Sequence, residues 1–129
     1  MEIKHFLTEK GPKAVGPYST AVEANGTVYM SGMLGIDPKT GKLAEGGVLH
    51  QATQMFENIR TVLSELQLDL GHVVKATVFL TDLNDFAPVN TLYGEAFGKD
   101  FPTRTCVQVS RLPLGAAIEM ECIAVRSAG

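Results

Sequence analysis

Residues 101–121 read FPTRTCVQVSRLPLGAAIEME, and the rest of the expected fold is arranged around them. This stretch predicts two β-strands joined by a loop that contains Pro and Gly. Successive side chains of a strand alternate between its faces, so Arg104 and Cys106 lie on the same face of the first strand. Glu119 and Glu121 interrupt a strongly apolar run on the second strand. A half-buried ion is costly unless it is paired, so these charges either pair with one another or wait for a ligand.

Two amphipathic helices are expected upstream of this stretch. Residues 50–68 carry apolar side chains at every third or fourth position, which is typical of a helix with one face packed on a sheet. A second helix follows the N-capping residues 82–85, has Pro88 in its first turn and is closed by Gly98. Between the two helices, residues 73–80 are rich in Val, Thr and Phe and predict a buried strand.

The N-terminal third predicts three more strands. Residues 2–6 form an edge strand, and residues 19–23 and 27–32 form a hairpin. The hairpin is indicated by the Asn25-Gly26 pair, which favours the tight turn that needs two positive φ angles. The glycine at the end of the third strand is expected to break it.

The order of elements is therefore β-β-β-α-β-α-β-β within a single domain, residues 1–129. We expect an α+β fold, a two-layer sandwich in which two helices cover one face of a mixed six-stranded sheet. The other face of the sheet is left bare, and Val107, Val109 and Ile123 are assigned to it. An uncovered apolar face predicts that copies of the chain associate through it.

Composition narrows the class of protein. The formal net charge is -3 and the basic residues are scattered, which disfavours nucleic-acid binding through a basic patch. The sequence has no long apolar run and no signal-peptide pattern, so we expect a cytoplasmic protein without a membrane segment. Cys106 and Cys122 show no metal-ligand spacing, so we expect reduced thiols and neither a metal nor a cofactor, with a disulfide between neighbouring strands as the alternative.

Three side chains of the opening stretch could take part in chemistry. The guanidinium of Arg104 matches a carboxylate in a bidentate pair, although an ordinary surface arginine is the alternative. Glu119 could act as a base or orient a water, with a pKa raised by burial, or it could pair with Arg104 or Lys75. Cys106 could be a nucleophile if Arg104 stabilised its thiolate, or it could only pack in the core.

Four further residues are candidates for a binding site. Tyr18 follows a Gly-Pro turn that fixes its ring, either in a pocket or as a plug of the core. Ser31 and Gly32 would offer an exposed hydroxyl and an open amide, which together could hold an anion. Asn90 lies in the apolar stripe of the second helix and needs hydrogen-bond partners, which could be a ligand or a neighbouring loop.

Several motifs spread over nearly the whole chain resemble the RidA/YjgF family. They are GPYS at 16–19, SG at 31–32, VFLTDLNDF at 78–86, FPTRTCV at 101–107 and IEME at 118–121. The resemblance implies a fold similar to chorismate mutase and a homotrimer with ligand clefts between its subunits. One departure is Met33-Leu34, where many relatives have Gln and a β-branched residue, and it affects the rim of the pocket.

The resemblance also implies an activity. Archetypal members of the family hydrolyse 2-iminopropanoate and 2-iminobutanoate to 2-oxo acids and ammonia. Arg104 would then bind the substrate carboxylate, and Glu119 together with the Cys106 region would orient the attacking water. The implied pocket residues are Tyr18, Ser31, Gly32 and Asn90. No cofactor or metal is implied.

Other functions remain open at this point. The cleft could belong to a non-catalytic module that senses a small carboxylate, or the protein could be chaperone-like. The family also includes translation inhibitors with ribonuclease activity. A ribonuclease would need His or Lys near the cleft and a basic path for the backbone, and the sequence predicts neither.

Overall fold

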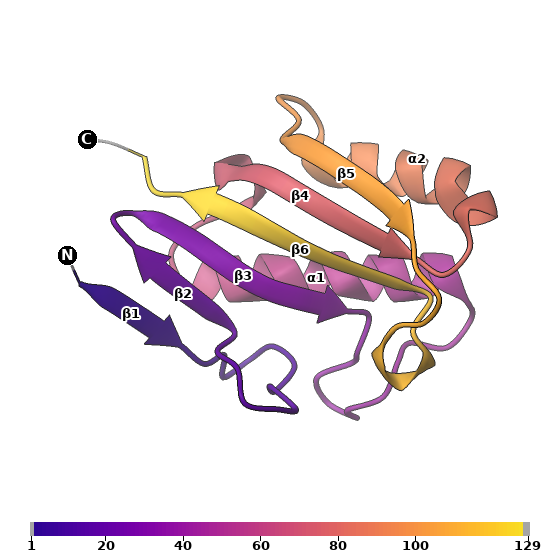
Figure 1. The fold of residues 1–129 in the computed structure, drawn as a ribbon, viewed down its shortest axis with the longest axis horizontal. Coiled ribbons are helices and arrows are strands. Elements are labelled where there is room, and N and C mark those ends of the chain that lie inside the picture. Colours follow the sequence, from indigo (N-terminus) through magenta and orange to yellow (C-terminus); the bar gives the residue numbers. More distant parts are fainter. Residues whose placement is uncertain (1, 128–129) are drawn as a thin grey trace.

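The computed structural model describes residues 2–127, in which six strands form one mixed sheet with two helices on the same face (Figure 1). The sheet order is β1-β2-β3-β6-β4-β5, in which β4 and β5 are parallel and the other neighbours antiparallel. This confirms the expected α+β sandwich. The strands are β1 (Ile3–Phe6), β2 (Ala21–Ala24), β3 (Thr27–Leu34), β4 (Val73–Leu80), β5 (Thr103–Gln108) and β6 (Ile118–Val125), and the helices are α1 (Val48–Glu65) and α2 (Phe86–Phe97).

The helix α1 forms the main contact between the two layers. It begins two residues earlier and ends three residues earlier than the predicted range 50–68. The chain leaves the helix at Leu66 and Gln67, and Gln67 takes a left-handed φ of 63°, so the helix stops short of position 68. The apolar stripe is buried as predicted, through Ala52, Met55, Phe56, Ile59, Val62 and Leu63.

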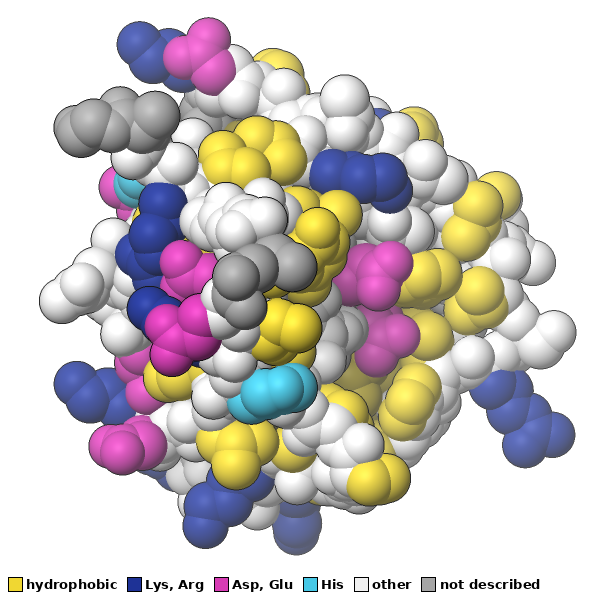
Figure 2. Space-filling model, turned by 60° about the vertical axis from the view of Figure 1, so that its left-hand side comes forward, with side chains coloured by type: hydrophobic (Ala, Val, Ile, Leu, Met, Phe, Trp, Pro, Cys, Tyr) yellow, Lys and Arg dark blue, Asp and Glu magenta, His cyan; other side chains and the backbone are white. Residues whose placement is uncertain are grey.

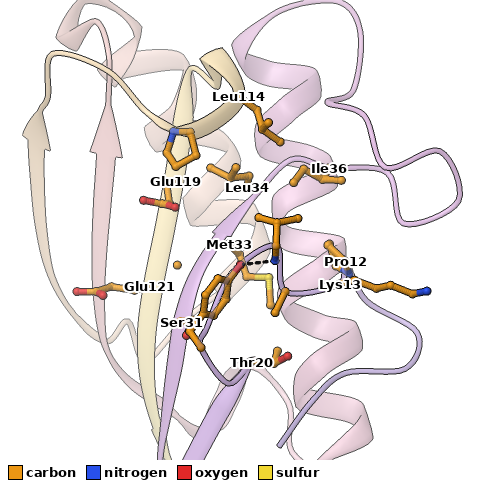
Figure 3. Close-up of a pocket in the computed structure, with 15 residues that line it drawn as sticks. Pro12, Lys13, Thr20, Ser31, Met33, Leu34, Ile36, Leu114, Glu119 and Glu121 are labelled. Atoms are coloured by element: carbon orange, nitrogen blue, oxygen red, sulfur yellow. Dashed lines mark hydrogen bonds between the residues drawn. The ribbon is translucent and has the colours of Figure 1, made fainter.

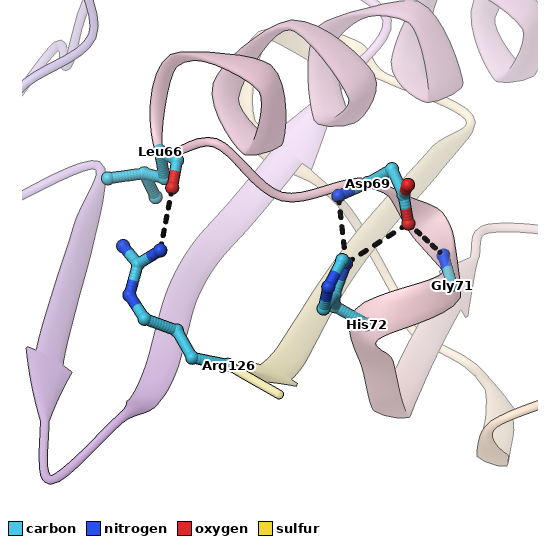
Figure 4. Close-up of polar contacts among 5 residues, drawn as sticks. All are labelled: Leu66, Asp69, Gly71, His72 and Arg126. Atoms are coloured by element: carbon cyan, nitrogen blue, oxygen red, sulfur yellow. Dashed lines mark hydrogen bonds and ion pairs between the residues drawn. The ribbon is translucent and has the colours of Figure 1, made fainter. Parts of the chain in front are cut away.

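Two groups of polar contacts fix the end of α1 (Figure 4). The side chain of Asp69 caps the 3-10 turn η1 (Leu70–His72) that follows the helix, where its Oδ1 accepts from the backbone N of Gly71 at 2.9 Å. Arg126, just after β6, donates from Nη1 to the carbonyl O of Leu66 at 2.9 Å. It thereby satisfies a carbonyl that the end of the helix leaves free.

The strand β3 differs from its prediction at Gly32. The predicted turn is present, with φ of 52° at Asn25 and 77° at Gly26. However, β3 does not stop at Gly32 but runs on to Leu34. The pairing of β3 with β6 shifts register between Met30 and Met33, which is a β-bulge. A bulge takes up an extra residue and turns the strand without ending it, so the glycine marks a bend and not a terminus.

The two faces of β6 differ in burial. Ile118, Met120, Cys122 and Ala124 are buried under the helices, and the intervening side chains lie on the other, open face of the sheet. Tyr29, Val107 and Ile123 share that open face, as the strand register requires. Figure 2 shows part of the surface from this side, where hydrophobic side chains surround acidic ones. The assignment of Val107 and Ile123 to the uncovered face is confirmed, while Val109 lies beyond the end of β5.

The two cysteines are free thiols. Cys106 lies on β5 and Cys122 on β6, and β4 runs between these strands. The alternative of a disulfide between neighbouring strands is therefore wrong.

Candidate functional site

The candidate residues divide between the two faces of the sheet. Arg104 pairs with Ala76 of β4, which is buried on the helix side. Glu119 pairs with Phe79, which points the opposite way because three positions separate it from Ala76. Arg104 and Glu119 of one chain therefore point away from each other across the sheet. The alternative that they pair with each other is wrong.

A pocket of about 410 Å³ lies on the open face beside Glu119. We call it the Glu119 pocket. Figure 3 shows Glu119 and Glu121 on one side of it and Ile36 and Leu114 on the other, with the Lys13 side chain pointing away. Its other lining residues are Pro12, Ala14, Val15, Tyr18, Thr20, Ser31, Gly32, Met33, Leu34 and Pro113.

Glu119 lies in an environment that suits a base. Burial raises the pKa of its carboxyl, and the negative charge of Glu121 raises the pKa further. A Cβ placed on Gly32 would lie only 2.8 Å from Cδ of Glu119. The glycine thus gives the carboxylate room to lie against the bulge of β3. This role of Gly32 differs from the predicted one, in which its amide held an anion.

Tyr18 and Ser31 form the wall of the Glu119 pocket next to the loop before β2. The ring of Tyr18 is 45% exposed, so its interpretation as a core plug is wrong. Its hydroxyl accepts from the backbone N of Val15 at 3.4 Å. The hydroxyl of Ser31 donates to the carbonyl O of Ser19 at 2.7 Å. The hydroxyl is thus half-buried and ties this loop to β3, whereas the sequence predicted it to be exposed.

A second pocket, of about 420 Å³, lies beside Arg104. We call it the Arg104 pocket. Nη1 of Arg104 donates to Oδ1 of Asn90 at 2.5 Å, so Asn90 holds the arginine and not a loop backbone. None of the ion pairs found within residues 2–127 involves Arg104. Its guanidinium therefore keeps N–H groups that can bind a carboxylate. The other lining residues are Tyr93, Gly94, Phe101 and Pro102.

Cys106 lies two positions from Arg104 on the same face of β5. Burial raises the pKa of its thiol, and the positive charge of Arg104 opposes this more weakly. A thiol that stays protonated is a poor nucleophile, so these surroundings favour the packing interpretation. The side chain packs against the main core.

Sequence reasoning assigned no role in the site to Phe86, Tyr93 and Leu114. Phe86 and Tyr93 contact the guanidinium of Arg104, and Leu114 lines the Glu119 pocket. The contacts of Phe86 and Tyr93 could have been predicted, because these residues lie four and three positions from Asn90 and so share its side of α2. Leu114 takes a left-handed φ of 59°, which no sequence pattern indicated.

The part of the chain that the structure describes contains no cluster of three or more His, Cys, Asp or Glu side chains able to hold a metal ion. Within the same residues, no helix combines the length and the apolar character that crossing a membrane requires.

Comparisons with known proteins identify the family of the chain. The profile of the RidA/YjgF proteins, described as Endoribonuclease L-PSP, matches residues 8–126. The chain belongs to the RidA/YjgF family. RidA from the Antarctic bacterium Psychrobacter is similar in structure, with a TM-score of 0.91 and 44% identity over 95% of this chain and 99% of that one. E. coli TdcF, solved with bound serine, has a TM-score of 0.89 and 40% identity over 96% of this chain and 99% of its own.

Within the family, the chain is also similar to proteins named for an activity. The 2-iminobutanoate/2-iminopropanoate deaminase of Capra hircus is 48% identical over 119 residues, which cover 92% of this chain and 87% of the goat protein. Relatives from cattle, mouse and human carry the same name.

Proposed function

We propose that the protein hydrolyses reactive 2-imino acids such as 2-iminobutanoate and 2-iminopropanoate to 2-oxo acids and ammonia. The observation that carries this proposal is an arginine without an acidic partner, together with a half-buried carboxylate whose pKa is raised. The first group suits a substrate carboxylate, and the second suits a base that activates water. The names of the mammalian relatives support the same reaction.

A complete site would need two chains. Because Arg104 and Glu119 point to opposite sides of one sheet, a substrate bound to the first cannot reach the second within the same chain. We propose a homotrimer in which the open faces pack together and each cleft joins the Arg104 pocket of one subunit to the Glu119 pocket of the next. The exposed Tyr29 and Val107 on the open face support this packing, because apolar side chains on a sheet are stabilised when a partner covers them.

The proposed reaction needs few groups. Arg104 binds the carboxylate and so places the adjacent imine carbon in the cleft. Glu119 accepts a proton from a water as the water oxygen attacks that carbon, and it returns this proton to the imine nitrogen to give an amino alcohol. The hydroxyl proton of this intermediate then passes to the nitrogen as the C–N bond breaks, which releases ammonia and leaves the 2-oxo acid. An imine conjugated to a carboxylate is already electrophilic, so positioning and proton transfer account for the rate.

The test is a coupled assay. A threonine dehydratase releases 2-iminobutanoate, semicarbazide traps the imine, and an active deaminase lowers the rate of semicarbazone formation. We expect Arg104→Ala to abolish this effect while the protein stays folded. Glu119→Gln should lower kcat strongly and KM little, as for lost activation of water. Near-normal turnover by Arg104→Ala would refute the assignment.

The family description also names an endoribonuclease, and this activity is the second candidate. The two pockets weaken it, because no histidine lines either of them and the side chain of Lys13, which lines the Glu119 pocket, points away from it. The two carboxylates of the Glu119 pocket would also repel a phosphate backbone, which opposes RNA binding. A protein that binds 2-oxobutanoate but leaves the imine unchanged would instead be a carboxylate-sensing module.

A further inference from the structure

The helix α2 presents three side chains to Arg104 from one side. Phe86, Asn90 and Tyr93 are spaced by four and three positions, which places them on the same face of a helix. The guanidinium carbon of Arg104 lies 4.8 Å from the centre of the Tyr93 ring and 5.4 Å from that of the Phe86 ring. A cation within about 6 Å of an aromatic ring face is attracted to it. Binding of a carboxylate by Arg104 does not by itself require these aromatic contacts.

The Tyr93 ring is the more firmly held of the two. It is 5% exposed, whereas Phe86 is 36% exposed. Tyr93 packs edge to face on Phe56 with ring centres 6.0 Å apart, and its centre lies 4.7 Å from that of Phe97. Phe56 itself is fully buried in the core. Tyr93 is thus a fixed platform, attached to the core on one side and touching the guanidinium on the other.

The ring of Tyr93, and not its hydroxyl, makes the contact with Arg104. The hydroxyl is buried and has no hydrogen-bond partner among residues 2–127. A buried hydroxyl without a partner destabilises a protein. The hydroxyl therefore offers no structural reason for a tyrosine at this position, and the contribution of the residue comes from its aromatic face.

We infer that Tyr93 is a positioning residue, whose ring holds the guanidinium of Arg104 in the orientation that receives the substrate carboxylate. A free arginine side chain has many rotamers, and fixing it before the ligand arrives lowers the entropy lost on binding. Asn90 holds the guanidinium at Nη1, and the ring of Tyr93 contacts its central carbon at 4.8 Å. The inference rests on the proposed function for the nature of the ligand, but not for the contact between the two side chains.

The first test measures the arginine without any ligand. The Nε–H signal of Arg104, assigned by its loss in Arg104→Lys, gives an order parameter by ¹⁵N relaxation. We expect a rigid side chain in the wild type and in Tyr93→Phe, which keeps the ring. In Tyr93→Leu we expect the order parameter to fall below about 0.6, the range of flexible groups. An unchanged value in Tyr93→Leu, or an equal fall in Tyr93→Phe, would overturn the inference.

Phe97→Leu is the matched control. Phe97 packs on Tyr93 at the end of α2, so this variant loosens the same cluster of rings without removing the one beneath Arg104. We expect the order parameter of Arg104 to stay high in this control. A fall as large as that in Tyr93→Leu would show that general loosening of the helix is responsible, and the inference would be wrong.

The second test measures binding of 2-oxobutanoate by calorimetry and turnover of the imine. Tyr93→Phe should bind as the wild type does, and Tyr93→Leu should raise Kd and KM by about 3- to 30-fold. kcat should change little, because Glu119 is untouched. Equal binding by Tyr93→Leu and the wild type would contradict the inference. If the wild type binds the oxo acid but does not hydrolyse the imine, the proposed deaminase function fails, while the order parameters still decide the role of Tyr93.

Discussion

A single methyl group added at Gly32 should slow the proposed imine hydrolysis by displacing Glu119. In Gly32→Ala the new Cβ would lie 2.8 Å from Cδ and 2.9 Å from Oε2 of Glu119. Ordinary contacts begin at 3.4 Å, so the carboxylate must move away by about 0.6 Å. The φ of Gly32 is not left-handed, so alanine can take the same backbone conformation without strain.

The expected size of the effect follows from this displacement. A misplacement of about 1 Å can lower a rate by about 100-fold, so a shift of this size should lower kcat by about 10- to 100-fold. KM should change little, because in the proposed site the substrate carboxylate binds to Arg104, which Asn90 holds in the other pocket. The clash is with the end of a side chain that can rotate, so the free energy of unfolding should change by no more than about 1 kcal/mol.

The assay is the semicarbazone assay, run on the four combinations of Gly32→Ala and Glu119→Gln. If the methyl group acts through the carboxylate, it should lower kcat in the wild type and have no further effect in Glu119→Gln. An unchanged kcat in Gly32→Ala would show that the methyl group does not displace a catalytic carboxylate. An equal loss in both backgrounds would show that the methyl group acts elsewhere in the pocket.

Three further predictions concern single side chains. Because burial raises the pKa of Glu119, its ionised form destabilises the fold, and the wild type loses part of its stability as pH rises through that pKa. Urea denaturation should therefore show Glu119→Gln to be more stable than the wild type at pH 7 but similar to it near pH 4. Cys106→Ala should keep turnover within about threefold of the wild type, because the raised pKa keeps the thiol from acting as a nucleophile. A loss of about 100-fold would show instead that Cys106 takes part in the reaction. Arg126→Ala removes paired hydrogen bonds to Glu23 and one to Leu66, so thermal melting should show that the free energy of unfolding falls by about 1–2 kcal/mol, with unchanged turnover. A variant as stable as the wild type would show that these bonds contribute nothing to stability.

Much of the fold follows from local patterns in the sequence. The alternation of Ile118, Met120 and Cys122 with charged residues gives the faces of β6, and the Asn25-Gly26 pair gives the hairpin. These features depend only on residues that are neighbours in the chain, so they can be predicted from the sequence. The same holds for the end of α2, whose closing Gly98 was predicted from a standard signal. The predicted capping at its start is wrong, because Asp82 caps the short 3-10 turn Leu83–Asp85 and Asp85 makes no capping bond with its side chain.

The misplaced features depend on contacts between distant segments. The bulge at Gly32 arises from the pairing of β3 with β6, and a glycine in a strand pattern looks the same whether it bends the strand or ends it. The opposite directions of Arg104 and Glu119 depend on β4, which lies between their strands and sets both registers. Alternation within each strand gave the right faces locally, but it could not relate one strand to the other.

In the proposed trimer one active site takes Arg104 from one subunit and Glu119 from another, so two inactive variants should restore activity when they are mixed. Arg104→Ala and Glu119→Gln chains are refolded together in equal amounts and assayed for imine hydrolysis. In a cyclic oligomer with random mixing, about a quarter of the clefts then combine an intact Arg104 with an intact Glu119. We expect the mixture to recover about a quarter of the wild-type turnover. A mixture as inactive as its two components, although the chains have mixed, would contradict it.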